Sequence, residues 1–121
     1  DRGLLDDAPR EQWREQALAL LSTYDVLMSP VMAQAPLAAK RWGESSWQAN
    51  MLANTRFAPF AAAWNVAGFP AMSVPAGVHP GHGTPMSVQL VARPGREAML
   101  LSVAAALESL RPWRRVAPAY S

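Results

Sequence analysis

The pattern of apolar and polar residues along the chain predicts three or so helices and three strands, with no repeat and no internal domain boundary. A first helix is expected over residues 9–23, with Asp7 as its cap and Pro9 in its first turn. A last helix is expected over residues 97–110. Its apolar stripe is wider than one contact face, so we expect it to be buried against more than one neighbour.

Two shorter helical segments are predicted in the middle of the chain. The first follows Ser45-Ser46, either of which can cap it. The second runs from about residue 54 to 66, and Gly68 ends it. Pro59 interrupts a continuous helix, so we expect the second helix to begin near Ala58.

Three strands are expected over residues 25–29, 71–75 and 86–91. The first is a short apolar run without alternation, which is typical of a strand buried on both faces. The other two alternate with a period of two. One of their faces carries Met72, Val74, Met86, Val88 and Leu90, and the other carries Ala71, Ser73, Ser87 and Gln89.

These elements do not make a closed structure by themselves. Three strands with apolar faces neither close a sheet nor cover its edges, so the sheet should continue into other sequence. We therefore expect residues 1–121 to be one segment of a larger α/β layer. A partner chain, a second copy of this chain or a preceding part of the same protein could supply the rest.

The amino-acid composition excludes several kinds of site and several classes of protein. The chain has 121 residues, of which 50% are hydrophobic and 17% charged, and it contains no cysteine. The lack of cysteine excludes a disulfide-stapled module, a thiolate zinc site and a cysteine nucleophile. No apolar run approaches the roughly 18–20 residues that span a membrane. The start of the sequence does not have the pattern of a signal peptide, and we expect a cytoplasmic protein.

Few residue groups offer catalytic or binding chemistry. His79 and His82 flank a turn without a third ligand, which favours a solvated loop over a metal site. Lys40 has no partner hydroxyl near it in sequence. The basic cluster around Trp113 is more typical of a solvated tail than of a phosphate-binding patch, because the net charge is only +2. We therefore expect no metal and no nucleic-acid partner.

The segment before Gly68 combines aromatic residues with very small ones. On a helix, Thr55, Ala58 and Ala62 would share one side. Small side chains there leave room either for a close-packed neighbour, the more common reason, or for a ligand. Asn65 would be costly to bury unless its amide is fully hydrogen-bonded, so we expect it to hold loop backbone in place.

Four motifs in register give the chain a resemblance to a known family. They lie in residues 24–30, 64–77 and 85–94, and in residues 100–108 together with Pro112-Trp113. Their order and spacing resemble the C-terminal portion of the amidase-signature hydrolases over about residues 10–118. The resemblance implies a mixed central sheet covered by helices on both faces, to which residues 25–29, 71–75 and 86–91 would contribute strands.

The family's chemistry is an amide hydrolysis in which a serine nucleophile is activated by a second serine and a lysine. A lysine held neutral can accept the proton that the serine loses, and backbone N–H groups stabilise the oxyanion. This sequence has no Gly-Gly-Ser-Ser-Gly-Gly stretch, and Lys40 does not match the family's catalytic lysine. The resemblance therefore implies that catalytic residues are absent from this chain and that the chain alone is inactive.

By position in the family, Thr55, Ala58 and Ala62 would form part of the substrate-pocket wall, and Asn65, Gly68 and Pro70 a structural loop. Relatives that act on glutamine place an acidic residue where Ala58 stands, so a less polar amide or ester is expected. The family generally needs no cofactor.

The implied partners are the N-terminal part of the amidase or a second copy of this chain, and in the complete enzyme a small-molecule amide. The alternative is a non-catalytic α/β binding or assembly module, dimeric through its strand edge.

Overall fold

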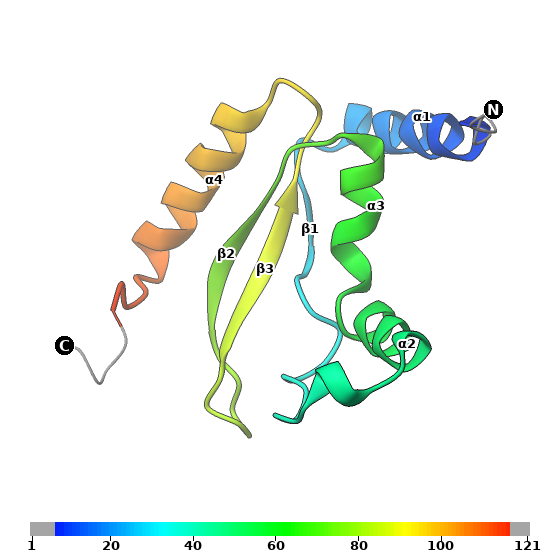
Figure 1. Cartoon of the computed structure of the whole chain (residues 1–121). Coiled ribbons are helices and arrows are strands. Elements are labelled where there is room, and N and C mark those ends of the chain that lie inside the picture. The colour runs from blue at the N-terminus through cyan, green and yellow to red at the C-terminus, as the bar shows by residue number, and fades with distance from the viewer. Residues whose placement is uncertain (1–6, 117–121) are drawn as a thin grey trace.

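The computed structural model describes residues 7–116. Over these residues the chain forms four α-helices and three strands, joined by loops and one short 3-10 turn (Figure 1). The predicted elements are confirmed with small shifts of their ends. In chain order they are α1 (Ala8–Thr23), β1 (Leu27–Pro30), the 3-10 turn Trp42–Glu44, α2 (Trp47–Phe57), α3 (Pro59–Ala67), β2 (Ala71–Val78), β3 (Pro85–Val91) and α4 (Glu97–Leu110).

The three strands form one sheet in the order β1-β3-β2, and both pairings are antiparallel. Met72 is paired with Leu90, and Val74 with Val88, which confirms that these residues share one face. An irregularity between Pro75 and Gly77 shifts the β2–β3 register near the end of the hairpin.

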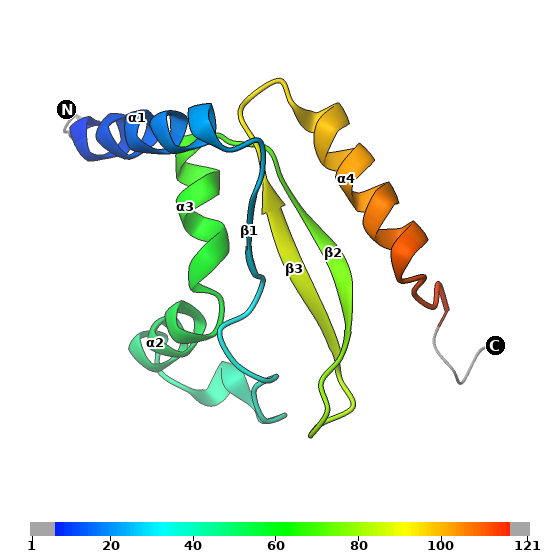
Figure 2. The same cartoon turned by 180° about the vertical axis from the view of Figure 1, so that it is seen from behind.

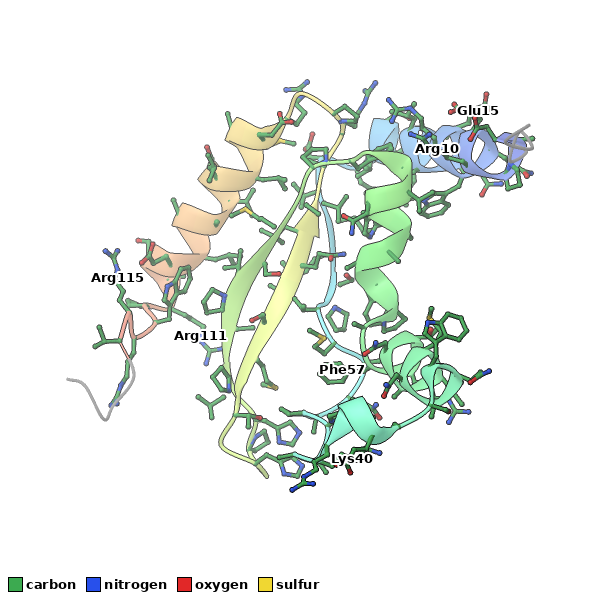
Figure 3. The ribbon with its side chains drawn as sticks, viewed as in Figure 1. Arg10, Glu15, Lys40, Phe57, Arg111 and Arg115 are labelled. Atoms are coloured by element: carbon green, nitrogen blue, oxygen red, sulfur yellow. The ribbon has the colours of Figure 1, made fainter. Side chains whose placement is uncertain are left out.

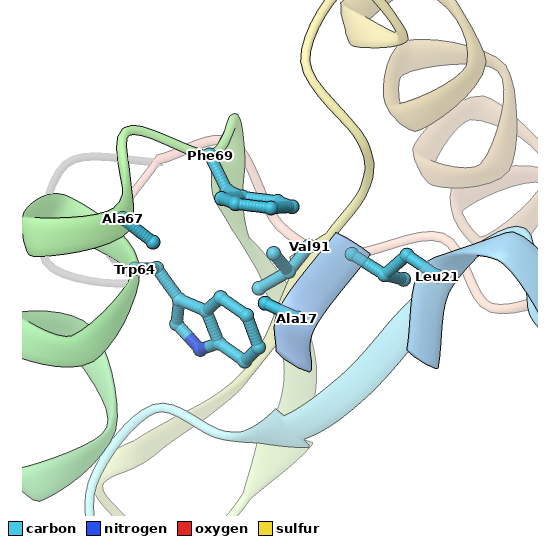
Figure 4. Packing of buried hydrophobic residues seen from close by; sticks show 6 residues of the cluster. All are labelled: Ala17, Leu21, Trp64, Ala67, Phe69 and Val91. Atoms are coloured by element: carbon cyan, nitrogen blue, oxygen red, sulfur yellow. The ribbon is translucent and has the colours of Figure 1, made fainter. Parts of the chain in front are cut away.

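Helices cover both faces of this sheet, as expected of the α/β class. In the two opposite views of Figures 1 and 2, α4 lies on one side of the strands and α3 on the other. The α4 face holds a core of Val74, Leu90 and Leu100, with Ala92 beside them. The other face holds the cluster shown in Figure 4, formed by Ala17, Leu21, Trp64, Ala67, Phe69 and Val91.

The prediction that the first strand is buried on both faces is wrong for this chain. β1 lies at an edge of the sheet and pairs only with β3. Val26 contacts the α4-side core and Leu27 the α1-side core, but Met28 is 54% exposed. Its side chain is exposed because no described element packs over that part of the edge strand.

The last helix is only partly covered. Leu100 is buried and its neighbours Val103 and Leu107 are half-buried against the sheet, whereas Leu110 is 79% exposed. The second contact face expected for this helix is therefore free in the described residues. None of the helices in residues 7–116 is long and apolar enough to cross a membrane.

The middle of the chain contains two helices because the backbone leaves helical geometry at Ala58. That residue has φ −126° and ψ 61°, ends α2 and precedes Pro59, the first residue of α3. Proline disfavours helical geometry in the residue before it and begins a new helix well. As predicted, Ser46 caps α2, with its hydroxyl accepting a hydrogen bond from the Ala49 N–H.

α1 is fixed to the C-terminal end of α3 by three side chains. Trp13 donates its Nε1–H to the Ala63 carbonyl at 2.8 Å, and Arg10 donates Nε–H to the Val66 carbonyl at 3.1 Å. Arg14 donates to the Ala67 carbonyl and places its guanidinium over the Phe69 ring, 5.6 Å from the centroid. Arg10 and Arg14 thus place two positive charges at the negative end of the α3 dipole. They also donate hydrogen bonds to carbonyls that have no partner within the helix.

The turn after α3 satisfies the remaining carbonyls. Gly68 has φ +69° and donates to the Asn65 carbonyl, while the Phe69 N–H bonds the Trp64 carbonyl. These two bonds form a Schellman motif. At the start of α1, by contrast, Asp7 occupies the cap position, but its side chain makes no capping hydrogen bond, so that part of the prediction is wrong.

Replacing Arg14 by alanine should lower the free energy of unfolding by about 1.5–3 kcal/mol, because the buried Ala67 carbonyl loses a charge-assisted hydrogen bond. Urea unfolding followed by circular dichroism measures the change. Glu15→Ala, on the same helix and exposed, is the matched control and should change stability by less than about 0.5 kcal/mol. Equal losses in both variants would contradict the role of Arg14.

Gly68→Ala should destabilise the chain by about 1–2 kcal/mol, because an alanine side chain disfavours the left-handed backbone at this turn. Gly43→Ala is the control, since an added Cβ there meets no atom within 4 Å and the residue does not have a positive φ. The same unfolding assay should show little change for Gly43→Ala. A Gly68→Ala variant as stable as the parent would refute the assignment of the turn.

Candidate functional site

The three residues predicted to form a pocket wall come from two helices rather than one. Thr55 lies in the last turns of α2, Ala58 at the break between the helices, and Ala62 in α3. They therefore do not form a stripe along one helix, because the backbone leaves helical geometry at Ala58, near where the second helix was expected to begin. Thr55 and Ala62 are exposed and Ala58 is half-buried, so the small side chains leave open surface on this side of the molecule.

A hollow of about 520 Å³ lies beside this surface. We name it the Phe57 hollow, after the residue that links it to the predicted wall. The loop after β1 and the ends of the β2–β3 hairpin form its other sides. Its lining includes Val31, Met32, Phe57, His79, Met86 and Ser87.

Backbone hydrogen bonds fix the segments that line the Phe57 hollow. The Ala33 N–H donates to the Phe57 carbonyl at 3.0 Å, which fixes the loop against the end of α2. The Val31 N–H donates to the Ser87 carbonyl at 3.3 Å and continues the β1–β3 pairing. Figure 3 shows Phe57 where the loop after β1 passes the α2–α3 junction. Thr55, Ala58 and Ala62 do not line the hollow themselves; the wall and the hollow are neighbours.

The hollow was not predicted from the sequence, because its walls come from segments that are distant along the chain. The loop after β1, the end of α2 and the β2–β3 hairpin all contribute to these walls. One feature of the sequence indicates that the loop after β1 packs against another part of the chain. An apolar, proline-rich loop that follows a strand is not polar enough to be solvated on all sides, so it needs a surface to lie on.

The polar groups of the hollow do not form a catalytic set. The Nδ1 atom of His79 accepts a hydrogen bond from the Gly81 N–H at 3.1 Å, and the rings of His79 and His82 lie 4.7 Å apart. No group of three histidine, cysteine or acidic side chains in residues 7–116 could hold a metal ion.

Hydroxyl nucleophiles have no activating partner in the described part of the chain. Within residues 7–116, no serine or threonine hydroxyl is hydrogen-bonded to a histidine or a lysine. Thr55, for example, donates its hydroxyl to the Met51 carbonyl. Lys40 lies at the surface with its Nζ 3.9 Å from the centroid of the Trp42 ring. This arrangement can bind and position a molecule, but it cannot activate a nucleophile.

A buried glutamine holds the first turn of α3 against the sheet. Gln89 of β3 is 5% exposed and donates its Nε2–H to the Phe60 carbonyl at 3.3 Å. The bond crosses from the sheet to the first turn of α3. Gln89 lies on the polar face predicted for β2 and β3 and thus has a structural role. Its side chain holds the segment that carries Ala58 and Ala62.

In the segment predicted to be a structural loop, Asn65 acts differently from the prediction. Its side chain is exposed, and the atom that fixes the turn is its backbone carbonyl, which accepts from Gly68. The backbone, not the amide, makes the bond because the αL turn at Gly68 brings its N–H back onto α3. The Pro70 carbonyl accepts from the Ala92 N–H at 3.2 Å and ties the start of β2 to the end of β3.

Comparisons with known proteins agree on one family. The family model described as Amidase matches residues 4–101. The chain is 32% identical over 123 residues to the acylamidase of Rhodococcus erythropolis, covering 100% of this chain and 25% of that protein. It is 38% identical over 104 residues to the 6-aminohexanoate-cyclic-dimer hydrolase of Pseudomonas sp. strain NK87, covering 85% of this chain and 21% of that protein.

Solved structures show the same relationship. The structure of a glutamyl-tRNA(Gln) amidotransferase subunit from Thermotoga maritima superposes with a TM-score of 0.64 and 26% identity, covering 88% of this chain and 22% of that one. The structure of 6-aminohexanoate cyclic dimer hydrolase gives a TM-score of 0.59 and 30% identity, covering 86% of this chain and 23% of that one. The chain thus spans between a fifth and a quarter of the length of the relatives it matches.

Proposed function

This chain belongs to the amidase family, and we propose that it acts as the C-terminal segment of an amidohydrolase that cleaves a carbon–nitrogen bond. In this proposal the segment supplies three strands of the central sheet and one wall of the substrate pocket. The observation that supports it most is the match of residues 4–101 to the family model in a chain whose described residues hold no activated nucleophile.

The chemistry would take place on residues outside this chain. We propose a serine nucleophile, a second serine and a lysine as the catalytic groups, supplied by an N-terminal part of the enzyme. Lys40 is not that lysine, since it lies exposed against Trp42 and away from any hydroxyl partner. The role of this chain is to hold the pocket wall rigid, because a positioned substrate reacts far faster than a mobile one.

The substrate we propose is an amide with an apolar acyl or alkyl part. The Phe57 hollow is lined mainly by apolar side chains and backbone, and no carboxylate lies among its lining residues. Ala58 stands at the helix break with no acidic group to recognise a glutamine side chain. An apolar group bound here would be held by burial of its surface rather than by a salt bridge.

The function is tested with a chimera in which this chain replaces the matching quarter of the Rhodococcus acylamidase. The chimera should hydrolyse an alkyl amide, whereas the 121-residue chain alone should show no turnover. Release of p-nitroaniline from an acyl p-nitroanilide measures the rate, and the acylamidase without that quarter is the control. Turnover by the isolated chain that a serine-directed inhibitor abolishes would overturn the proposal, as would a folded chimera without activity.

The pocket wall is tested in the same chimera with Ala58→Leu and Ala62→Leu. Each substitution replaces a methyl by an isobutyl side chain and should raise KM for a long-chain anilide about 10-fold or more, since a mismatch of a few methylenes in an apolar site has effects of that size. Ala106→Leu on the exposed side of α4 is the matched control and should leave KM unchanged. Unchanged KM in both wall variants would exclude these residues from the pocket.

A further inference from the structure

A second hollow lies on the α4 side of the sheet and shares one lining residue, Pro85 of the hairpin, with the Phe57 hollow. Its volume is about 900 Å³, and we name it the Arg111 hollow. The end of α4 with the segment after it forms one wall, and the strands with the β2–β3 hairpin form the other. Its apolar lining includes Met28, Val78, Leu107, Leu110, Trp113 and Val116.

This lining is unusually exposed for such large apolar side chains. Leu110 is 79% exposed, Val78 60% and Val116 56%. Apolar surface gathered in a concave site, rather than scattered over the molecule, is typical of a binding surface. Trp113 is half-buried against the α4-side core and contributes an aromatic ring to the lining of the hollow.

The rim of the hollow is positively charged. Arg111, Arg114 and Arg115 all border it, and no acidic residue is among its lining residues. Arg115 is bound to Glu108 at 2.9 Å, which leaves Arg111 and Arg114 as exposed cations without an ion-pair partner in residues 7–116. Figure 3 shows Arg111 reaching from the end of α4 toward the strands, whereas Arg115 points away from them.

We propose that the Arg111 hollow binds a long-chain carboxylate, with the alkyl chain on the apolar lining and the carboxylate on Arg111 and Arg114. A planar guanidinium pairs well with a carboxylate through two parallel hydrogen bonds. Two free cations are too few to follow a nucleic-acid backbone, which needs several aligned contacts. A neutral or cationic occupant would leave both arginines unpaired. This site does not depend on the amide hydrolysis proposed above.

The test is a calorimetric titration of the chain with monomeric dodecanoate. One molecule should bind saturably, and decanoate should bind about 15-fold more weakly, because each methylene contributes about fourfold. Dodecanol and dodecyltrimethylammonium should bind at least 10-fold more weakly than dodecanoate. Acetate that competes as well as dodecanoate, or binding only to anionic vesicles, would overturn the proposal.

Paired variants locate the site. Arg111→Ala combined with Arg114→Ala should weaken dodecanoate binding at least 10-fold, whereas Arg93→Ala combined with Arg96→Ala, which removes the same charge outside the hollow, should not. Leu110→Ser, at an exposed position that does not endanger folding, should weaken binding several-fold. Equal effects of the two arginine pairs, or no saturable binding at all, would overturn the proposal.

The acylamidase chimera provides a further check. Dodecanoate should bind there as it does to the chain alone, and binding should be independent of amide turnover. If the chimera hydrolyses its substrate but binds no dodecanoate, another part of the protein covers the hollow, and the proposal is wrong while the proposed function stands.

Discussion

The fixed junction between α1 and the end of α3 determines where the other elements lie. A helix that ends inside a domain leaves carbonyl groups that need partners. Here Arg10 and Arg14 supply them from a helix more than fifty residues away, and Gly68 supplies the rest from the turn. Because Ala67 and Phe69 are buried at this point, the junction also sets the start of β2 and the α1-side core.

The junction fixes one end of α3, and Gln89 fixes the other. The bond from Gln89 to the Phe60 carbonyl holds the first turn of the helix on β3, so the break at Ala58 has little freedom to move. The end of α2 is in turn bonded to Ala33 of the loop after β1. A chain of contacts therefore runs from the core to the Phe57 hollow. In the proposed function these contacts would position the pocket wall.

Local sequence signals predicted most of the fold because they act within a few residues. Pro59 and Gly68 mark the two ends of α3, and the alternation around Val74 and Leu90 predicts the shared face of β2 and β3. Other features depend on which segments distant in the sequence contact one another. They are the exposure of β1, the hydrogen bond from Arg14 and the Phe57 hollow. Residue spacing does not show which distant segments contact one another, so the hollow beside Ala58 was not predicted.

The exposed apolar side chains bear on the proposed role of this chain as one segment of a larger enzyme. Trp47 is 70% exposed on α2, Val66 is 50% exposed on α3 and Leu101 is 63% exposed on α4. These side chains lie on three different elements, whereas the interior around Val91 and Leu90 is closed on both faces of the sheet. A sheet covered on both faces keeps its shape, while its two edge strands, β1 and β2, offer backbone groups to further strands. That combination fits a segment that brings a preformed wall to catalytic groups held elsewhere.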